Sequence, residues 1–189
     1  VALLAHYLGC AGAYVGRRVF AVGDGEHHYP NLFFILVGES SKGRKGTAWA
    51  RTKQVWRRAF PEFIADNTRN GLSSGEGLIY DVRDGEPDHD EDDPKSDGGI
   101  QDKRRLIVET EISSPLRRMK IAGNSLSAIV RQSWDGDILR TMVKNDPNKS
   151  TDAHISIIGH GVAEELIEEI DPISARNGLA NRFIYLYSE

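Results

Sequence analysis

The chain of 189 residues lacks the features that mark several common classes of protein. Its single cysteine, Cys10, excludes a disulfide framework and any metal site built from several thiolates, and it fits a reducing compartment. The apolar opening, residues 1–16, is shorter than the roughly 20 residues of a membrane span and lacks the basic start of a signal peptide. We therefore expect a cytoplasmic protein with no membrane partner.

A large excess of either charge is also absent, since the net charge is −4, which argues against an extended basic face. Acidic residues crowd into one segment, at about 84–101, between glycines and prolines and with few apolar residues for a core. We expect this segment to be a flexible loop within a single domain, 1–189. Because the chain enters an apolar pattern at once and without methionine, we expect a fragment of a longer protein.

Short apolar runs alternate with helical patterns along the chain. Strands are predicted for residues 19–23, 32–37, 106–108, 154–160 and 183–187. Helices are predicted for residues 1–16, 46–60 and 162–170, with two short ones in 115–133 and a helix start after the turn at 70–71. Strands separated by helices predict an α/β fold with a mostly parallel central sheet flanked by helices.

The strongest functional pattern is a glycine-rich segment between the predicted strand 32–37 and the helix that follows. Its candidate nucleotide contacts are Gly38, Gly43, Arg44, Lys45, Gly46 and Thr47. A phosphate chain needs inward backbone N–H groups, a helix N-terminus, a lysine on the outer phosphates and a hydroxyl on magnesium. The order strand, glycine loop and helix therefore predicts a P-loop that binds ATP and Mg²⁺, with Lys45 as the phosphate lysine and Thr47 as a metal ligand.

The spacing of this loop is irregular. The usual P-loop places lysine directly after the second glycine and serine or threonine directly after that lysine, whereas Arg44 and Gly46 intervene in this chain. The Lys-Gly-Thr ending resembles the loop of adenylate kinases, although the segment from Gly38 to Lys45 is one residue longer. Arg44 or Lys42 would then be a second phosphate contact. The alternative is a basic surface loop that precedes an amphipathic helix.

A P-loop also predicts an acid after a second strand, and the segment KRRLIVETEI supplies Glu109 and Glu111. Period-two alternation directs both side chains to the same side of an extended segment. We choose Glu109 as the acid that activates water or binds the metal, because it directly ends the apolar run. Acids after a strand are otherwise solvated loop residues.

Two further residues are candidates for catalysis. His160 ends the third predicted strand, where a polar side chain would face the γ-phosphate as a sensor; a neutral histidine bonded to a backbone carbonyl is the alternative. Arg182 precedes the last strand and would contact a phosphate of its own or of a neighbouring subunit's nucleotide as an arginine finger. It would otherwise form an ion pair with a carboxylate.

Six segments of the chain occur in the order of a known family. They are GESSKGRKGT, GLSSGEGLIYDVRD, LIVETEI, LSAIVRQSWDG, HISIIGH and NGLANRF. In this order the chain resembles the largely uncharacterised primase/helicase-like ATPases of bacterial, plasmid and phage proteins. The resemblance implies a RecA-like P-loop NTPase core in a homo-oligomeric motor of mobile-element replication, of the hexameric helicase type. Single-stranded DNA and a primase-type domain would be its partners.

The resemblance also implies roles for individual residues. It assigns Lys45 and Thr47 to the phosphate loop, Glu109 to the second acidic motif, His160 to the sensor strand and Arg182 to the terminal arginine motif. A helicase-like, ATP-hydrolysing motor domain is therefore the leading hypothesis. The alternatives are a nucleotide-dependent DNA-binding or assembly module with little turnover, and a small-molecule phosphotransferase.

Overall fold

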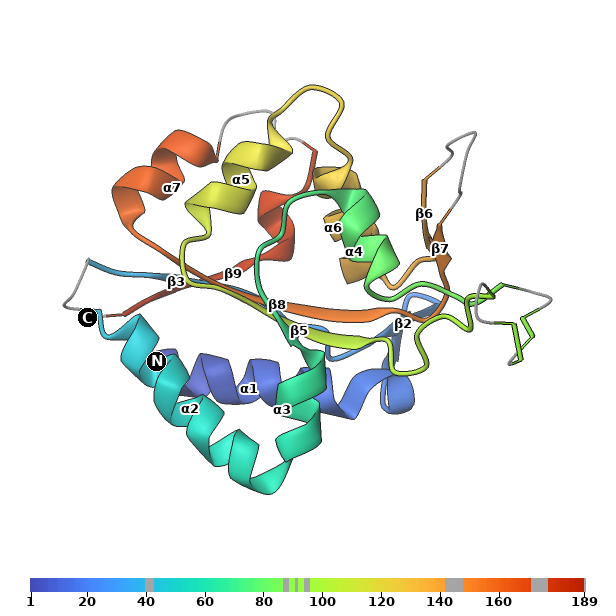
Figure 1. The fold of residues 1–189 in the computed structure, drawn as a ribbon. Coiled ribbons are helices and arrows are strands. Elements are labelled where there is room, and N and C mark those ends of the chain that lie inside the picture. The colour runs from blue at the N-terminus through green and yellow to red at the C-terminus, as the bar shows by residue number, and fades with distance from the viewer. Residues whose placement is uncertain are drawn as a thin grey trace.

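A computed structural model describes residues 1–39, 43–86, 89–90, 92–93, 96–141, 148–170 and 177–188. Its centre is a five-stranded, fully parallel sheet in the order β4-β5-β8-β3-β9 (Figure 1). The strands are β3 (Phe33–Val37), β4 (Thr68–Arg69), β5 (Arg104–Glu109), β8 (His154–Gly161) and β9 (Ile184–Tyr187). The parallel α/β prediction is confirmed, and four of the five predicted strands lie in this sheet.

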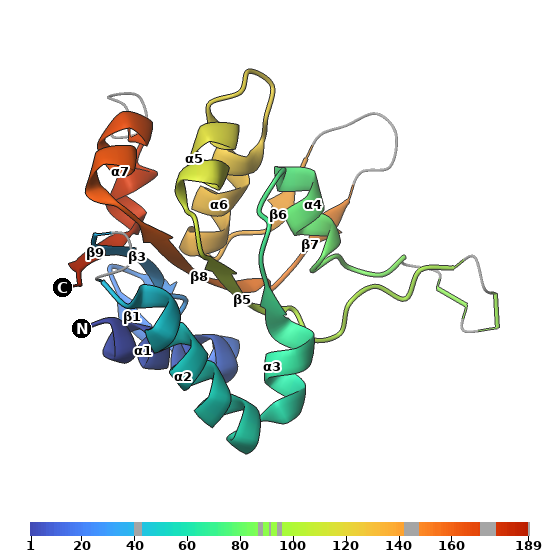
Figure 2. The same cartoon turned by 60° about the vertical axis from the view of Figure 1, so that its left-hand side comes forward.

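Helices cover both faces of the sheet. On one face lie α1 (Ala2–Val15), α2 (Lys45–Ala59) and α3 (Pro61–Asn67); on the other lie α4 (Gly75–Tyr80), α5 (Ser113–Met119), α6 (Leu126–Asp135) and α7 (Ala163–Glu169) (Figure 2). The result is a three-layer arrangement with a separate apolar core on each side of the sheet.

The central strand β3 is apolar throughout because it is buried on both faces. In β3, Phe33 and Ile35 belong to the core beneath α4–α7, whereas Phe34 and Leu36 belong to the core beneath α1–α3. This double burial explains why the sequence shows a continuous apolar run in place of an alternating one.

Pro61 separates α2 from α3 and is the first residue of α3. A proline at the first helical position loses no intrahelical hydrogen bond.

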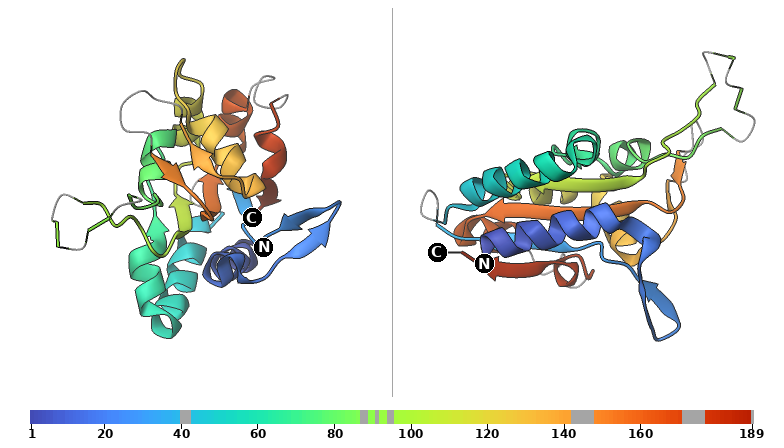
Figure 3. Two further views of the ribbon diagram at one scale, coloured as in Figure 1. Left: turned by 90° about the vertical axis from the view of Figure 1, so that its right-hand side faces the viewer. Right: turned by 90° about the horizontal axis from the view of Figure 1, so that it is seen from below.

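The remaining short elements lie outside the main sheet. They are two antiparallel pairs, β1 (Ala21–Gly23) with β2 (Glu26–His28) and β6 (Leu139–Arg140) with β7 (Lys149–Ser150), and two 3₁₀ turns, η1 (Gly16–Arg18) and η2 (Ala180–Arg182). The strand predicted at 19–23 therefore belongs to a hairpin, which projects from the body of the molecule (Figure 3). The described residues of segment 84–101 form no helix or strand; the others lie outside the described residues.

None of the helices in the described part of the chain has both the length and the apolar character that a membrane crossing needs.

Candidate functional site

A cavity of about 430 Å³ opens where the carboxyl ends of β3, β5 and β8 meet. Ligands of open parallel sheets bind at this edge, and the volume is that of a small-molecule site. Its lining includes Arg44, Lys45, Gly46 and Thr47 from the start of α2, Thr110 and Glu111 after β5, His160 from β8 and Glu165 from α7. The glycine loop, the acidic segment and the histidine thus meet at one place.

The glycines of the loop allow close backbone contacts with the end of the chain. A Cβ atom on Gly38 would lie 2.3 Å from the carbonyl oxygen of Ser188, and one on Gly43 would lie 3.0 Å from the same atom. The Ser188 hydroxyl donates to the Gly43 carbonyl at 3.0 Å, and its backbone N–H donates to Val37 at 2.7 Å. The backbone directly after β9 therefore packs against the glycine loop. A residue with a Cβ atom at position 38 would clash with the Ser188 carbonyl, so this contact requires Gly38.

The extra residue of the loop is accommodated by a left-handed turn. Arg44 has φ 40° and ψ 24°, a conformation that few non-glycine residues adopt. This turn lets α2 begin at Lys45 despite the irregular spacing. The first helical bond runs from the Ala48 N–H to the Arg44 carbonyl, so the N–H groups of the three residues before Ala48 have no intrahelical acceptor and can receive an anion. Lys42 lies outside the described residues.

Lys45 places its ammonium group inside the cavity. Its Nζ donates to the Gly38 carbonyl of the glycine loop at 2.6 Å. Burial lowers the pKa of Lys45, although the nearby carboxylate of Glu165 partly opposes this shift. The group is thus a partly desolvated cation beside the first turn of α2.

His160 is held by a second buried histidine. The Nε2 atoms of His160 and His6 are 2.9 Å apart, and the His6 Nδ1 lies 2.7 Å from the Ala2 carbonyl. Because a carbonyl only accepts, His6 donates from Nδ1 and accepts at Nε2, so His160 donates from its Nε2. Burial lowers the pKa of His160 to about 4, helped by the positive charges possible on His6 and Lys45. His160 therefore enters the cavity wall as a neutral ring of fixed tautomer.

His154, on the same face of β8, makes a similar contact: its Nε2 donates to the Gly12 carbonyl of α1 at 3.0 Å. Burial lowers the pKa of this histidine too, to about 4. The two histidines of β8 thus attach α1 to the sheet in their neutral forms.

Acidification should therefore destabilise the fold before the carboxylates titrate. The folded-state pKa values of His154 and His160 lie below the ordinary 6.5, so protonation favours the unfolded chain. Their contribution is complete above pH 6.5 and is lost as the pH falls from 6.5 to 4, by about 2 kcal/mol per histidine at pH 5. Urea unfolding at pH 7 and pH 5 measures this loss. His154→Gln, which still donates to Gly12, should show a smaller pH dependence; an unchanged one would contradict the assignment.

The two candidate acids have different surroundings. The carboxylate of Glu109, the last residue of β5, is buried and accepts the Leu72 N–H at 2.7 Å, and it does not line the cavity. Glu111 is exposed and lines the cavity together with Lys45. The geometry therefore favours Glu111 as the acid at the site, whereas sequence reasoning ranked Glu109 first.

The donor set of the cavity fits Mg²⁺ bound to a phosphate chain. The Thr47 hydroxyl and the Glu111 carboxylate are oxygen ligands of the type that magnesium prefers. Within the described ranges, no group of three or more His, Cys, Asp or Glu side chains could hold a metal alone. This agrees with a magnesium ion that takes one or two protein ligands and the remainder from phosphates and water.

Arg182 lies away from this cavity. It precedes β9, and all five strands are parallel, so it is at the amino edge of the sheet, opposite the loop. Its guanidinium forms a double hydrogen bond with the Asp135 carboxylate, with the shorter N–O distance at 2.5 Å. Arg182 therefore does not line the cavity, and the ion pair with a carboxylate is the arrangement that the structure shows.

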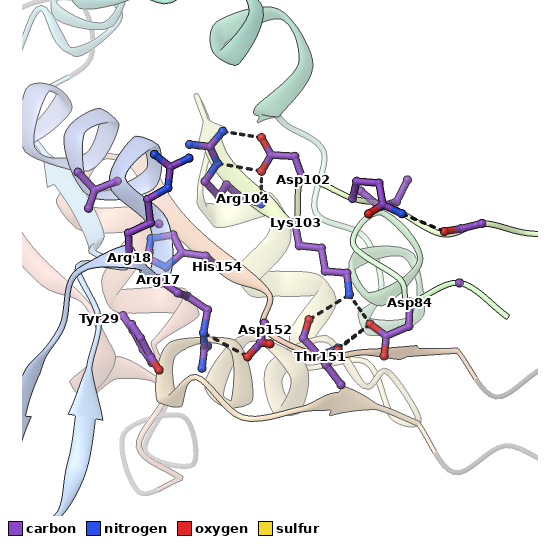
Figure 4. A pocket seen from close by; sticks show the side chains of 16 residues that line it. Arg17, Arg18, Tyr29, Asp84, Asp102, Lys103, Arg104, Thr151, Asp152 and His154 are labelled. Carbon is purple, nitrogen blue, oxygen red and sulfur yellow. Dashed lines mark hydrogen bonds and ion pairs between the residues drawn. The ribbon is translucent and has the colours of Figure 1, made fainter. Parts of the chain in front are cut away.

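A larger cavity, of about 920 Å³, lies at the same amino edge of the sheet (Figure 4). Its charged side chains mostly pair with one another: Arg17 with Asp152 at 3.5 Å, Arg104 with Asp102 at 2.6 Å, and Lys103 with Asp84. The hydrogen bond from Arg104 is the main cause that lowers the pKa of Asp102 to about 2. Size alone therefore does not identify the functional site.

Sequence reasoning missed one residue that lines the 430 Å³ cavity and one that contacts the cavity wall from behind. Glu165, in the first turn of α7, faces Lys45, and His6 contacts His160 from α1. His6 is a polar residue in the otherwise apolar run at the start of the chain. This was the one sequence signal that could have marked it as a residue with a buried polar partner.

Comparisons with known proteins identify no relative. No model of a protein family matches the chain, and no curated protein matches it. The likeness to primase/helicase-like ATPases therefore stays a hypothesis that depends on the six segments.

Proposed function

We propose that the chain is the ATP-binding and ATP-hydrolysing core of a RecA-like P-loop NTPase. The observation that supports this most is the meeting of Lys45, Thr47, Glu111 and His160 around one cavity at the N-terminus of α2. These groups supply the cation, the hydroxyl, the acid and the polar strand end that phosphoryl transfer to water requires.

The strand order supports the same proposal. β8, which ends in His160, lies between β3, which leads into the loop, and β5, which leads into the acidic segment. A sensor strand between the phosphate-loop strand and the acid strand is the arrangement expected of a RecA-like core. In this order the strand that ends in His160 lies between the strand before the lysine and the strand before the acid, which supports a sensor role for the histidine.

Each residue then has a defined task. Lys45 and the free N–H groups of α2 hold the phosphates, and Thr47 and Glu111 are positioned to hold Mg²⁺, which neutralises charge on the phosphates when bound. Glu111 also lies where an attacking water would be oriented. The family resemblance extends the proposal to a helicase-like, oligomeric motor that acts on DNA in the replication of mobile elements.

Titration calorimetry with ATP, in the presence and absence of Mg²⁺, tests the central part. We expect saturable binding that Mg²⁺ strengthens, followed by release of phosphate. Stimulation of phosphate release by single-stranded DNA would support the motor. Binding without turnover would support an assembly module, and transfer to a small acceptor would support a phosphotransferase. Absence of ATP binding would refute the proposal as a whole.

A further inference from the structure

A second groove, of about 360 Å³, lies beside the nucleotide cavity. Trp49, Lys53 and Arg57 of α2 form one wall, and Arg69 of β4 lies across from them. Thr110 lines both the groove and the 430 Å³ cavity, so the two are neighbours at the end of β5.

The groove is positive in a chain whose net charge is negative. α2 contains five basic residues, Lys45, Arg51, Lys53, Arg57 and Arg58, and no acidic one. None of the described residues that line the groove is acidic, whereas carboxylates line both cavities described above. The side chains of Lys53 and Arg57 are exposed and form no ion pair within the described part of the chain. Their charge is therefore available to an anionic partner.

The spacing of the α2 side chains suits an extended chain of phosphates. Trp49, Lys53 and Arg57 are four residues apart and so lie on one helix face, with about 6 Å of axial rise between neighbours. This rise is comparable with the separation of successive phosphates along an extended single strand. Trp49 adds a partly exposed aromatic ring, with the Lys53 Nζ 5.9 Å from its centroid. Cationic grooves with aromatic side chains are the usual means of holding single strands.

We propose that this groove binds the phosphodiester backbone of single-stranded nucleic acid. Lys53 and Arg57 contact its phosphates, and the Trp49 end lies next to the nucleotide cavity; Arg69, across the groove, is already paired with Asp81 at 3.1 Å. The two exposed cations of α2, four residues apart on one helix face, are placed for a chain of anions.

The geometry also connects the groove with the nucleotide cavity, a step that rests on the proposed function. The ring of Trp49 stacks on His6, with centroids 5.6 Å apart and an interplanar angle of 25°. His6 in turn bonds to His160 in the wall of the cavity. A strand that shifts Trp49 would therefore act on the ring that fixes the tautomer of His160. We expect a strand in the groove to change the rate of ATP hydrolysis through this contact, and His6→Ala to weaken that change without weakening strand binding.

Fluorescence anisotropy with a labelled oligo-dT, in the absence of ATP, tests the binding step. The variant Lys53→Glu/Arg57→Glu should bind at least about tenfold more weakly, and the slope of log K against log salt should fall by about 1.4 for two lost phosphate contacts. The matched control is Arg51→Glu/Arg58→Glu, which makes the same charge change on the same helix but outside the groove. Each double variant also removes one cation from the last turn of α2, so helix stability is matched. The control should stay within about threefold of the parent.

Several results would overturn the proposal. Equal losses in the two double variants would show that the charge of the helix, and not the groove, attracts the strand. Equal affinity for a duplex, or displacement by polyglutamate of equal charge, would also refute it. Oligo-rU in place of oligo-dT distinguishes RNA from DNA. A protein that binds ATP but no oligonucleotide refutes the groove alone, and one that binds oligonucleotide but no ATP refutes the proposed ATPase alone.

Discussion

Replacing Lys45 by alanine should weaken ATP binding by about 100-fold or more, which corresponds to about 2.8 kcal/mol. The Lys45 ammonium is partly desolvated and lies at the N-terminus of α2, where the proposal has the free N–H groups bind the phosphates as well. Removing it leaves phosphate charge without its closest cation in a cavity that other carboxylates, including Glu165, already make unfavourable for anions. Titration calorimetry measures the loss directly.

The fold should survive this substitution. In the ligand-free protein Lys45 makes one hydrogen bond, to the Gly38 carbonyl, whose loss costs about 1 kcal/mol. Arg51→Ala is the matched control, because Arg51 is exposed on the same helix and lines neither the cavity nor the groove. Thermal unfolding should rank both variants close to the parent. If Lys45→Ala kept the parent's ATP affinity, the loop would be the basic surface loop that its irregular spacing also allows.

The fold could be predicted where burial leaves a local pattern. β3 and β8 are covered on both faces, so β3 is a continuous apolar run and β8 contains the short apolar run Ile155–Ile158 interrupted only by Ser156. β4 has only two residues, Thr68–Arg69, with no run to detect, and it is a strand because it pairs with Leu106 and Ile107 of β5. Of the hairpin β1–β2, only the first strand was predicted, at 19–23. The local sequence indicates an extended segment but does not show which strand it pairs with.

The site could be predicted as far as chain order determines it. The loop, the acidic segment and His160 each follow a strand, and parallel strands bring their carboxyl ends to one edge. The order of strands along the chain does not decide whether Glu109 or Glu111 faces the cavity. Alternation directs both to one side only while the chain stays extended, but β5 ends at Glu109 and the chain then turns so that the Ile112 N–H bonds to His160. The bend, a tertiary feature, decides which acid faces the cavity.

His6 shows the same limit more clearly. It is 154 residues away from His160 in sequence, and the two meet because α1 packs against β8. Nothing in residues 1–16 specifies that packing beyond a histidine in an apolar helix. A side chain whose partner is that distant in the chain is found only when the fold is known.

Replacing Glu111 by glutamine should lower the turnover of ATP by about 100-fold or more and leave the affinity for ATP, measured without Mg²⁺, within about threefold. A neutral amide of nearly the same shape keeps the cavity lining but can neither accept a proton from water nor hold Mg²⁺ as a carboxylate does. Single-turnover release of phosphate, at ATP concentrations above the dissociation constant, separates this loss from any change in binding.

Glu109→Gln is the matched comparison, two residues away and with the same chemical change. Its amide oxygen can still accept the Leu72 N–H that Glu109 holds at 2.7 Å, so the strand end should keep its place and turnover should stay within a few-fold of the parent. The two variants therefore assign the acid without a change of fold. Loss of turnover in Glu109→Gln with normal turnover in Glu111→Gln would reverse the assignment. The buried Glu109 carboxylate would then have to leave the Leu72 N–H and enter the cavity when ATP binds. Normal turnover in both would place the acid elsewhere, with Glu165 of the same cavity next to be replaced.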